Sequence, residues 1–476
     1  MKRIAIIGGG VSGLSAAFSL EELRQKGAKV EYSLLEATSR LGGVLRTENV
    51  DDCLVEAGPD SFLTEKPWAS DLCRRVGIGD QLIGSNDAER KTYILLNRRL
   101  VPLPDGLMFM VPTNFAAAAA SPLFSNRTKL RILRERFLPP QRHESDESVA
   151  AFVERHYGSE MVERLADPLL SGIYGGQAKN LSVRAVLPRF AEMEAQYGSL
   201  GKGMLATRKK SNQVAANSSA VSIPSIFTSL RDGMQSMSDA IAARLPDESV
   251  RTGAPVQGVQ REGGGWVVSA GFGSDEFDGI IFAVPAHAAA QLLGTMSDDL
   301  AGELRGIPYS SSVTVAMVYS QDVRASLPPG FGFLVPRSEG LRMLAVTFVH
   351  NKFPHRAPPD RALLRCFLSG TEEDDLLELS DEHILAIIHA ELRQTLDITA
   401  DPRAVRIFRW KNAMAQYSVG HLERLVRIDR LMKNFPTLAL AGNGYRGIGI
   451  PDCVRSGQQA VARVSAALGL APITSE

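Results

Sequence analysis

Residues 8–13, Gly-Gly-Gly-Val-Ser-Gly, have the types and spacing that can hold a diphosphate group. They match the pattern G-x-G-x-x-G. Its first glycine permits a tight turn, its second lets the backbone approach a pyrophosphate, and its third lets a helix pack against a strand. Glu36 follows Gly13 by 23 residues and can accept hydrogen bonds from the two hydroxyls of a ribose. Together these residues predict a dinucleotide site.

A dinucleotide site needs a strand before the glycine turn and a helix after it, and the sequence predicts both. Residues 3–7 form a short apolar run that suits a buried parallel strand, residues 14–24 are helix-like, and residues 30–35 predict a second strand that leads into Glu36. The N–H groups at the helix start would face the anion. A glycine turn without a ligand is the simpler alternative. A secretory signal is another, but three consecutive glycines and the charges at 21–24 argue against it.

The composition excludes several other classes of function. The 476 residues allow two or three domains, and 53 basic against 53 acidic residues give no indication of a nucleic-acid partner. Four cysteines without a C-x-x-C pair predict neither a disulfide framework nor a zinc site, and we expect no metal. Because no export signal is recognised, we expect a cytoplasmic protein.

One apolar segment raises the question of membrane contact. Residues 107–124 are rich in Met, Phe and Ala, but two prolines and two polar residues interrupt them, so no transmembrane helix is predicted. We expect a helical region at a pocket mouth or at the surface, where it could touch a membrane peripherally. The alternative is a buried pair of helices.

The residues after Glu36 narrow the cofactor. Arg40-Leu41-Gly42-Gly43 resembles the R-x-G-G element that the flavin-dependent amine oxidase superfamily carries after its ribose-binding acid, and simple NAD dehydrogenases do not usually show it. The resemblance therefore implies FAD rather than NAD. In the same superfamily, the segment that matches 58–61 runs beside the flavin, and a strand residue that matches Val256 meets the adenine-ribose end.

A second glycine-rich turn lies far along the chain. Residues 438–441 predict a buried strand, residues 442–449 are rich in glycine, and a helix is predicted to start near Pro451, a residue favoured at first helical positions. The free N–H groups at this helix start would stabilise negative charge on a reduced flavin.

Four motifs together resemble the oxygen-dependent porphyrinogen oxidases, most closely the bacterial soluble type. They are residues 58–63, residues 167–176, Arg409-Trp410 with Gln416-Tyr417, and residues 447–453. The resemblance implies a six-electron oxidation of protoporphyrinogen IX or coproporphyrinogen III to the porphyrin in haem biosynthesis, with O₂ as acceptor and hydrogen peroxide as by-product. The motifs do not decide between the two porphyrinogens.

The candidate site residues follow from these motifs. We expect Gly172 to approach the reacting pyrrole, because the small residues that end the segment 166–176 let a backbone come close to a ligand; an ordinary interhelical turn is the simpler interpretation. We expect Lys66, Arg98 and Lys352 to bind propionates, with Lys66 as the first candidate. The simpler interpretation of Lys66 is a solvated surface lysine, and that of Trp410 is core packing. The expected cofactor contacts are Gly8, Gly9, Gly10, Val11, Ser12, Gly13, Glu36, Ala37, Arg40, Gly42, Gly43, Gly58, Pro59, Asp60, Ser61, Val256, Trp410, Gly442, Gly447, Ile448 and Ile450.

The expected fold is α/β, with a discontinuous Rossmann-like FAD-binding domain, a mixed-sheet substrate domain and a helical insertion. The FAD-binding domain is predicted at 1–90, 216–300 and 425–476, the substrate domain at 91–104 and 301–424, and the helical domain at 105–215. Within these domains, residues 198–220 are predicted to form a mobile loop or a crossover.

Two rival functions stay open on the sequence alone. The first is another oxidase or desaturase of the same superfamily, and the second is a non-catalytic escort protein on the same fold, in which the nucleotide site is usually degraded. The resemblance also implies hand-over of the product to a ferrochelatase, and a homodimer is a further expectation.

Overall fold

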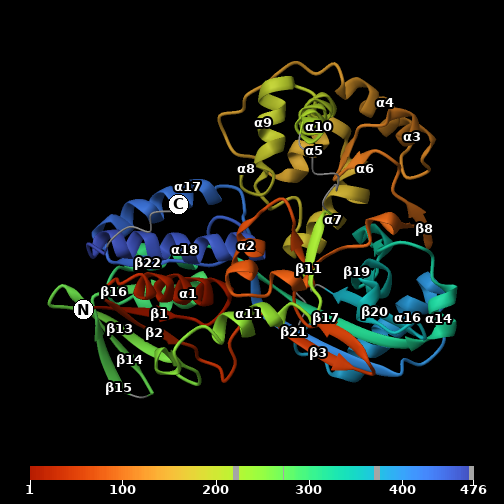
Figure 1. Cartoon of the computed structure of the whole chain (residues 1–476). Helices are drawn as coiled ribbons and strands as arrows, with labels where there is room; N and C mark the ends of the chain where they lie inside the picture. The colour runs from red at the N-terminus through yellow and green to blue at the C-terminus, as the bar shows by residue number, and fades with distance from the viewer. Residues whose placement is uncertain (218–224, 272, 369–375, 471–476) are drawn as a thin grey trace.

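The computed structural model describes residues 1–217, 225–271, 273–368 and 376–470. The chain folds into three parts (Figure 1). The part at the left holds the N-terminus and α18 (Ile450–Ala467), a group of helices lies at the top, and a large sheet lies at the lower right.

A five-stranded parallel sheet forms the centre of the first part. Its order is β12-β2-β1-β16-β22, and each neighbouring pair is parallel. The strands come from three separate stretches of the chain, which confirms the predicted discontinuous Rossmann-like sheet. They are β1 (Lys2–Ile7), β2 (Val30–Leu35), β12 (Val250–Arg251), β16 (Gly279–Phe282) and β22 (Leu438–Leu440).

Side chains alternate across this sheet, so each face has its own core. Ile4 and Ile6 of β1 pack beneath α1 (Val11–Gln25) and α18 (Ile450–Ala467). Ala5 and Ile7 pack on the opposite face against an antiparallel β-meander and two helices. The meander is β13 (Val256–Glu262), β14 (Gly265–Ala270) and β15 (Gly273–Phe277), and the helices are α12 (Ala286–Leu293) and α13 (Asp298–Arg305). Covering both faces suits a parallel sheet.

A seven-stranded mixed sheet forms the second part, in the order β21-β17-β20-β19-β18-β7-β8. Only the β18–β7 pair is parallel among its described strand pairs. Helix α16 (Asp381–Leu396) covers one face with Ile384, Ile388 and Leu392. The strands are β7 (Thr92–Leu96), β8 (Arg99–Pro102), β17 (Tyr309–Ser320), β18 (Gly332–Leu334), β19 (Met343–Phe348), β20 (Arg361–Leu368) and β21 (Ala404–Ala415).

The third part is a group of helices around a separate apolar core. Side-chain oxygens of Asn114, Ser125, Ser148 and Ser182 each accept a hydrogen bond from the first turn of the helix that follows, which fixes four of the helix starts. The helices are α3 (Phe115–Ala120), α4 (Asn126–Glu135), α5 (Val149–Tyr157), α6 (Ser159–Met161), α7 (Asp167–Tyr174), α8 (Val183–Val186), α9 (Pro188–Tyr197) and α10 (Leu200–Asn217), with a π-helical turn at Val162–Ala166.

The sequence prediction for residues 198–220 is wrong. Residues 200–217 form α10 rather than a loop, because Ala, Leu, Met, Lys and Arg favour helix whatever their polarity, and the Ser199 hydroxyl accepts the N–H of Lys202 at 3.1 Å. The rest of that predicted loop, 218–220, lies outside the described residues. Residues 107–124 are partly buried and partly exposed: Met110, Val111, Leu123 and Phe124 are buried, which favours the alternative of a buried segment, whereas Ala116, Ala119 and Ala120 are exposed. Residues 167–174 form α7, in line with the predicted helical domain.

The remaining elements lie outside the two large sheets. Strand β11 pairs with β5 and β6, β3 pairs with β4, and β9 pairs with β10. No helix in the described ranges is long and apolar enough to cross a membrane. These elements are β3 (Thr47–Val50), β4 (Cys53–Glu56), β5 (Phe62–Leu63), β6 (Leu82–Gly84), β9 (Leu107–Met108), β10 (Val111–Pro112), β11 (Phe227–Leu230), α2 (Trp68–Arg75), α11 (Gln235–Ala242), α14 (Gln321–Ser326), α15 (Val349–Lys352) and α17 (His421–Leu431).

Candidate active site

The glycine turn between β1 and α1 has the geometry of a phosphate cradle. Gly8 has φ +105°, which favours glycine, and a Cβ on Gly13 would lie 1.8 Å from the Gly8 carbonyl oxygen. A Cβ on Gly10 would meet nothing within 4 Å, so this residue borders open space. Within the described chain, no side chain caps α1, whose first residues are Val11 and Ser12. The first N–H groups of α1 can therefore serve an anion.

Glu36 lies beside this turn, as predicted. One carboxylate oxygen accepts the N–H of Gly9 at 2.7 Å, and the other accepts the backbone N–H and the hydroxyl of Thr38, each at 2.8 Å. These contacts fix the carboxylate at the end of β2. The Glu36 carbonyl accepts the N–H of Ala254, which brings the start of β13 and Val256 to the same end of the sheet. Ala37 is exposed next to Glu36.

The R-x-G-G element packs against the glycine turn. The N–H of Gly42 donates to the Gly9 carbonyl at 2.8 Å. The Arg40 guanidinium donates to the carbonyls of Leu41, at 2.8 Å, and of Leu45, at 2.7 Å, and also to the carbonyl of Gly43. Burial lowers the pKa of Arg40. The Arg40 side chain therefore fixes the conformation of the loop. In this conformation the backbone of the loop can face a ligand.

The second glycine-rich turn is held by Tyr417. Its hydroxyl accepts the N–H of Gly447 at 2.7 Å and donates to the Asn443 carbonyl at 2.7 Å. The Tyr417 ring stacks on His421 with 4.1 Å between ring centroids. Gly442 donates its N–H to the Ser456 hydroxyl at 3.1 Å. These contacts fix the shape of the turn before α18 begins.

Helix α18 then starts at Ile450, with Gly449 as its N-cap and, among the described residues, no side chain that caps it. Gly447 and Ile448 are half-buried just before this start, and Ile450 is buried. The N-terminal N–H groups of α18 are thus available to stabilise negative charge.

The two helix starts lie side by side. The Ser12 hydroxyl on α1 donates to the Cys453 carbonyl on α18 at 2.9 Å, and the Ser15 hydroxyl donates to the Val454 carbonyl at 2.9 Å. Strands β1 and β22 are parallel members of one sheet, so both helices begin at its carboxyl edge, where ligands of such sheets bind. The arrangement provides two adjacent sites for negative charge.

Two side chains of the mixed sheet hold the segment 57–61 through hydrogen bonds to its backbone. The indole N–H of Trp410 donates to the Ala57 carbonyl at 3.0 Å, and Arg365 donates to the Gly58 carbonyl at 2.5 Å. Trp410, predicted as an aromatic neighbour of the flavin, therefore positions the strand that precedes Gly58. Pro59 is half-buried, and the Ser61 hydroxyl donates to Asp60 at 2.7 Å.

The structure gives Lys352 a partner that we did not expect. Its ammonium group lies 2.9 and 3.0 Å from the two carboxylate oxygens of Asp60, and both side chains are 13% exposed. Burial alone would raise the pKa of Asp60, but Lys352 and Arg365 outweigh it and hold this pKa well below its usual range. Lys352 is thus committed to a buried ion pair, which disfavours the predicted contact with a propionate.

Lys66 lies at the start of α18. Its ammonium group is 2.6 Å from a carboxylate oxygen of Asp452, a residue that is 4% exposed and lies in the first turn of that helix. The Lys66 side chain is 35% exposed. Lys66 therefore lies near the helix start that is predicted to contact the flavin and can still be reached from solvent. The sequence reasoning missed Asp452, although its place directly after Pro451 was a usable signal.

Gly172 is exposed on α7, and a Cβ there would meet only Leu334 of β18, at the ordinary contact distance of 3.7 Å. The described protein atoms therefore leave room for a side chain at position 172, and only a bound ligand would exclude one. The Gln416 amide donates to the Tyr174 carbonyl at 2.5 Å and to the Ser310 hydroxyl at 2.9 Å, which ties the end of α7 to the mixed sheet. Arg98 is exposed in the β7–β8 turn, where its backbone N–H donates to Glu339 at 3.3 Å.

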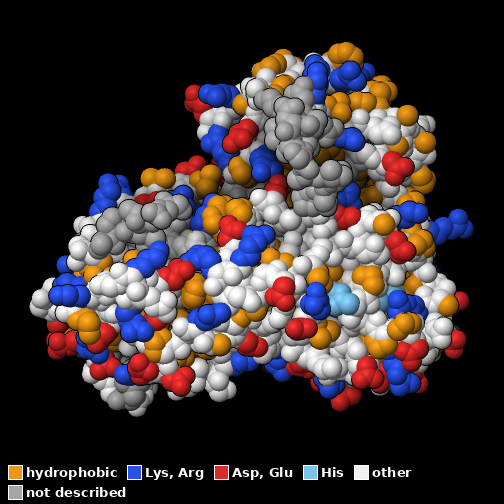
Figure 2. Space-filling model, in the orientation of Figure 1, with side chains coloured by type: hydrophobic (Ala, Val, Ile, Leu, Met, Phe, Trp, Pro, Cys, Tyr) orange, Lys and Arg blue, Asp and Glu red, His pale blue; other side chains and the backbone are white. Residues whose placement is uncertain are grey.

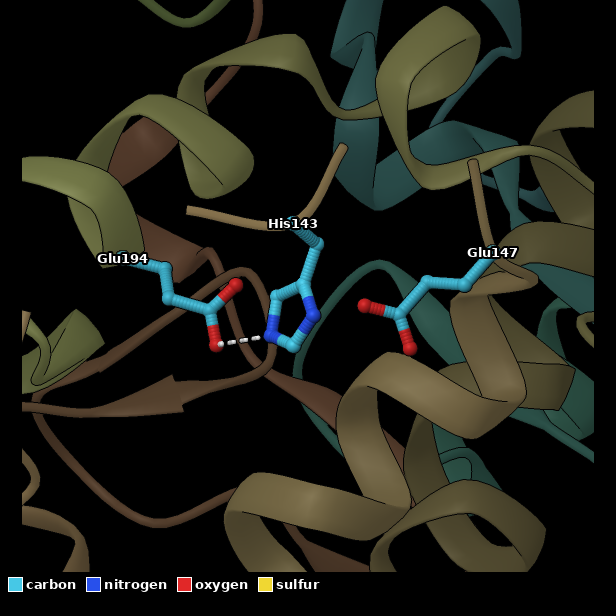
Figure 3. A group of neighbouring side chains, drawn as sticks. All are labelled: His143, Glu147 and Glu194. Atoms are coloured by element: carbon cyan, nitrogen blue, oxygen red, sulfur yellow. Dashed lines mark ion pairs between the residues drawn. The ribbon is translucent and has the colours of Figure 1, made fainter. Parts of the chain in front are cut away.

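A separate acidic cluster lies in the helical part. His143, Glu147 and Glu194 bring one potential ligand atom each within 4.8 Å of one another (Figure 3), beside a cavity of about 970 Å³. Arg155 donates to both glutamates, at 2.6 Å each, and His156 lies 3.2 Å from Glu194. Because Arg155 already pairs with both carboxylates and His156 contacts Glu194, these contacts favour an ion-pair network over a metal centre.

The fold and the two-part site define a flavin-dependent oxidoreductase. The chain belongs to the family of flavin containing amine oxidoreductases, whose family model matches residues 11–465. FAD fits the observed cradle: the open space at Gly10 and the uncapped start of α1 suit its diphosphate, Glu36 suits its ribose, and the start of α18 suits its ring system.

Particular relatives cover nearly the whole chain. The chain is 32% identical over 465 residues to a coproporphyrinogen III oxidase of Bacillus subtilis, with 97% of each chain covered. It is 28% identical to the chloroplastic protoporphyrinogen oxidase 1 of Arabidopsis thaliana, covering 97% of this chain and 87% of that one. A crystal structure of a protein assigned as a protoporphyrinogen oxidase, from Exiguobacterium, has a TM-score of 0.86 at 30% identity and covers 98% of this chain and 99% of that chain.

Proposed function

We propose that this protein oxidises coproporphyrinogen III to coproporphyrin III, with FAD as cofactor and O₂ as final acceptor. The observation that carries the proposal is the similarity to coproporphyrinogen III oxidases over 97% of the chain, with the FAD cradle complete. Six electrons and six protons leave the substrate in three two-electron steps, and three O₂ become three H₂O₂. Bound FAD would supply the hydride acceptor and its reaction with O₂.

The residues of the chain have defined tasks in this reaction. The first turn of α1 and Glu36 hold the diphosphate and ribose. The start of α18 places N–H dipoles where negative charge develops on reduction, and Tyr417 holds the preceding turn in place. No proton-transfer residue is assigned.

The substrate contacts are part of the proposal. Gly172 would leave room for the macrocycle beside α7, and Lys66 would bind a propionate, exchanging or sharing its contact with Asp452. Arg98 is exposed and without a side-chain contact among the described hydrogen bonds, so it serves as a second propionate candidate. Lys352 is the weakest candidate, because its charge is compensated within the protein.

Protoporphyrinogen IX is the second candidate substrate, since the Arabidopsis relative carries that name. The test is anaerobic mixing of the purified yellow protein with each porphyrinogen, followed by porphyrin fluorescence after air is admitted. We expect the larger kcat/KM with coproporphyrinogen III. A larger kcat/KM with protoporphyrinogen IX would reverse the substrate assignment. If neither porphyrinogen is oxidised faster than it autoxidises, the proposed function is wrong.

The same experiment separates the rival functions. An escort protein would purify without FAD colour, whereas an amine oxidase would turn over amines and leave both porphyrinogens unchanged. The proposal also includes action in the cytoplasm, hand-over of the porphyrin to a ferrochelatase and a homodimer. Light scattering of the purified protein tests the last of these.

A further inference from the structure

Five charged side chains form a buried cluster beside the segment 57–61, and their charges do not cancel. The cluster contains three cations and two carboxylates, so it carries one positive charge in excess. None of the five side chains is more than 13% exposed. We call this group the Asp60 cluster. Its members are Glu56, Asp60, Lys352, Arg356 and Arg365.

Four of the five charges are paired at short range. Arg356 donates to the Glu56 carboxylate at 2.5 Å, and the Lys352 ammonium group lies 2.9 Å from a carboxylate oxygen of Asp60. Arg365 is the fifth charge. Its one ion pair within the described residues is with Asp60, at 3.7 Å, and Lys352 already binds that carboxylate more closely. The excess positive charge of the cluster therefore lies on Arg365.

The Arg365 guanidinium is shielded from water. Its side chain is 4% exposed, and its Nε–H has no hydrogen-bond partner in the part of the chain that the structure describes. Burial lowers the pKa of Arg365, although the Asp60 and Glu56 carboxylates act in the opposite direction. The cations on the face drawn in Figure 2 differ, because they lie among acidic side chains and face water. A buried charge that is balanced incompletely is costly, so it indicates a further negative charge that a ligand supplies.

Arg365 contacts the wall of the FAD cradle through Gly58. Its guanidinium donates to the Gly58 carbonyl at 2.5 Å. A Cβ on Gly58 would lie 2.0 Å from the Val44 carbonyl oxygen, so these two backbones touch. The residue before Val44 is Gly43, and a Cβ there would lie 3.3 Å from the Cα of Gly10. A continuous set of contacts thus joins Arg365 to the glycine turn, and its charge can act across this short, water-poor distance.

We propose that Arg365 is a positioning residue for the redox step, which holds Gly58 at the cradle and stabilises the negative charge of the reduced flavin. A hydride brings two electrons and one proton, so FAD that accepts one gains a single negative charge. That charge would balance the excess charge of the Asp60 cluster. A substrate carboxylate is the poorer match, because the cluster is buried and its most exposed cation, Lys352, is already paired. The proposal concerns the cofactor and does not depend on which porphyrinogen is oxidised.

The measurement is the midpoint reduction potential of bound FAD, determined anaerobically against a reference dye. Arg365→Gln removes the excess charge, whereas Arg365→Lys keeps it. Lys352→Met removes one cation from the same cluster and leaves the contact between Arg365 and Gly58 in place. The matched control is Arg361→Gln, because Arg361 lies four residues earlier on β20, on the same face of the sheet, and pairs with Asp51 at 2.8 Å. The FAD spectrum and the melting temperature verify that each variant is folded.

We expect Arg365→Gln and Lys352→Met each to weaken the binding of reduced FAD relative to oxidised FAD at least about tenfold. For a two-electron couple this lowers the midpoint potential by about 30 mV. Arg365→Lys and the Arg361→Gln control should keep the potential of the wild type. If one of the two test variants does not fold, the other decides.

Several outcomes would overturn the proposal. An unchanged potential in Arg365→Gln would show that its charge does not act on the flavin. An equal fall in Arg365→Gln and Arg365→Lys would assign the effect to the contact with Gly58 and not to charge. A raised KM for the porphyrinogen at an unchanged potential would assign the excess charge to a substrate carboxylate. If neither Arg365→Gln nor Lys352→Met retains FAD while Arg361→Gln does, the Asp60 cluster is a requirement for FAD retention and the redox role is withdrawn.

Discussion

The hydroxyl of Ser12 donates a hydrogen bond to the carbonyl of Cys453, and 441 residues of sequence separate the two. This bond joins the first turns of α1 and α18, the two helix starts that the FAD cradle requires. Their relative position is therefore set by a direct contact and not only by the sheet beneath them.

Ser12→Ala should weaken FAD binding about fivefold, because the loss of one hydrogen bond costs roughly 1 kcal/mol and here loosens the alignment of two charge-stabilising helix starts. Fluorescence titration of the apoprotein with FAD measures this. Ser15→Ala is the matched control, since Ser15 makes the equivalent bond one turn further from the cradle. It should lower the melting temperature to a similar extent and leave FAD affinity unchanged. Equal affinities of the two variants would contradict the alignment argument.

Gly172→Val should lower kcat/KM by about a hundredfold or more while the protein stays as stable as the wild type, because the site is exposed and open toward Leu334. Steady-state kinetics and thermal melting measure the two effects. The control is Gly302→Val on α13, another exposed helical glycine, where an added Cβ would meet nothing within 4 Å. If Gly172→Val keeps full turnover, α7 does not border the substrate.

Lys66→Ala should mainly change KM, whereas Lys352→Ala should mainly lower the free energy of unfolding. Lys66 is accessible, and Asp452 keeps a second partner in Arg455 at 3.3 Å, so we expect a KM raised about tenfold with a small loss of stability. Lys352→Ala leaves Asp60 buried with only the more distant Arg365, at 3.7 Å, which should cost about 3 kcal/mol of unfolding free energy. Kinetics and urea unfolding distinguish them. An unchanged KM for Lys66→Ala would remove Lys66 from the substrate site.

Glu194 should make stability depend on acid pH. Burial would raise its pKa, but hydrogen bonds from His156 and Arg155 outweigh it and lower the pKa to about 2. A carboxyl whose folded pKa lies below its unfolded value stabilises the protein above the unfolded pKa, roughly pH 4, and loses this contribution as pH falls toward 2. Glu194→Gln should flatten that part of the curve in urea unfolding between about pH 5 and pH 3. An unchanged slope would mean that other carboxyls dominate acid unfolding.

The part of the FAD cradle that suits the diphosphate and the ribose could be predicted from sequence because its residues are local. Gly8, Gly13 and Glu36 act within one strand–turn–helix–strand unit, where spacing fixes geometry. The partners of Lys66 and Lys352 could not be predicted in this way, because Asp452 and Asp60 lie hundreds of residues from them and only the packing of separate sheets joins them. Helix α10 was missed since its polar residues were interpreted as a loop, although polarity says little about helix propensity.

The cradle is divided between β1–α1 and β22–α18, which are separated by hundreds of residues of sequence. A nascent chain on the ribosome therefore presents only the diphosphate half until α18 has emerged, and a ribosome that stalls earlier releases a chain unable to retain the flavin. Capture of the yellow cofactor thus reports that translation has reached α18 and that the chain has closed on itself.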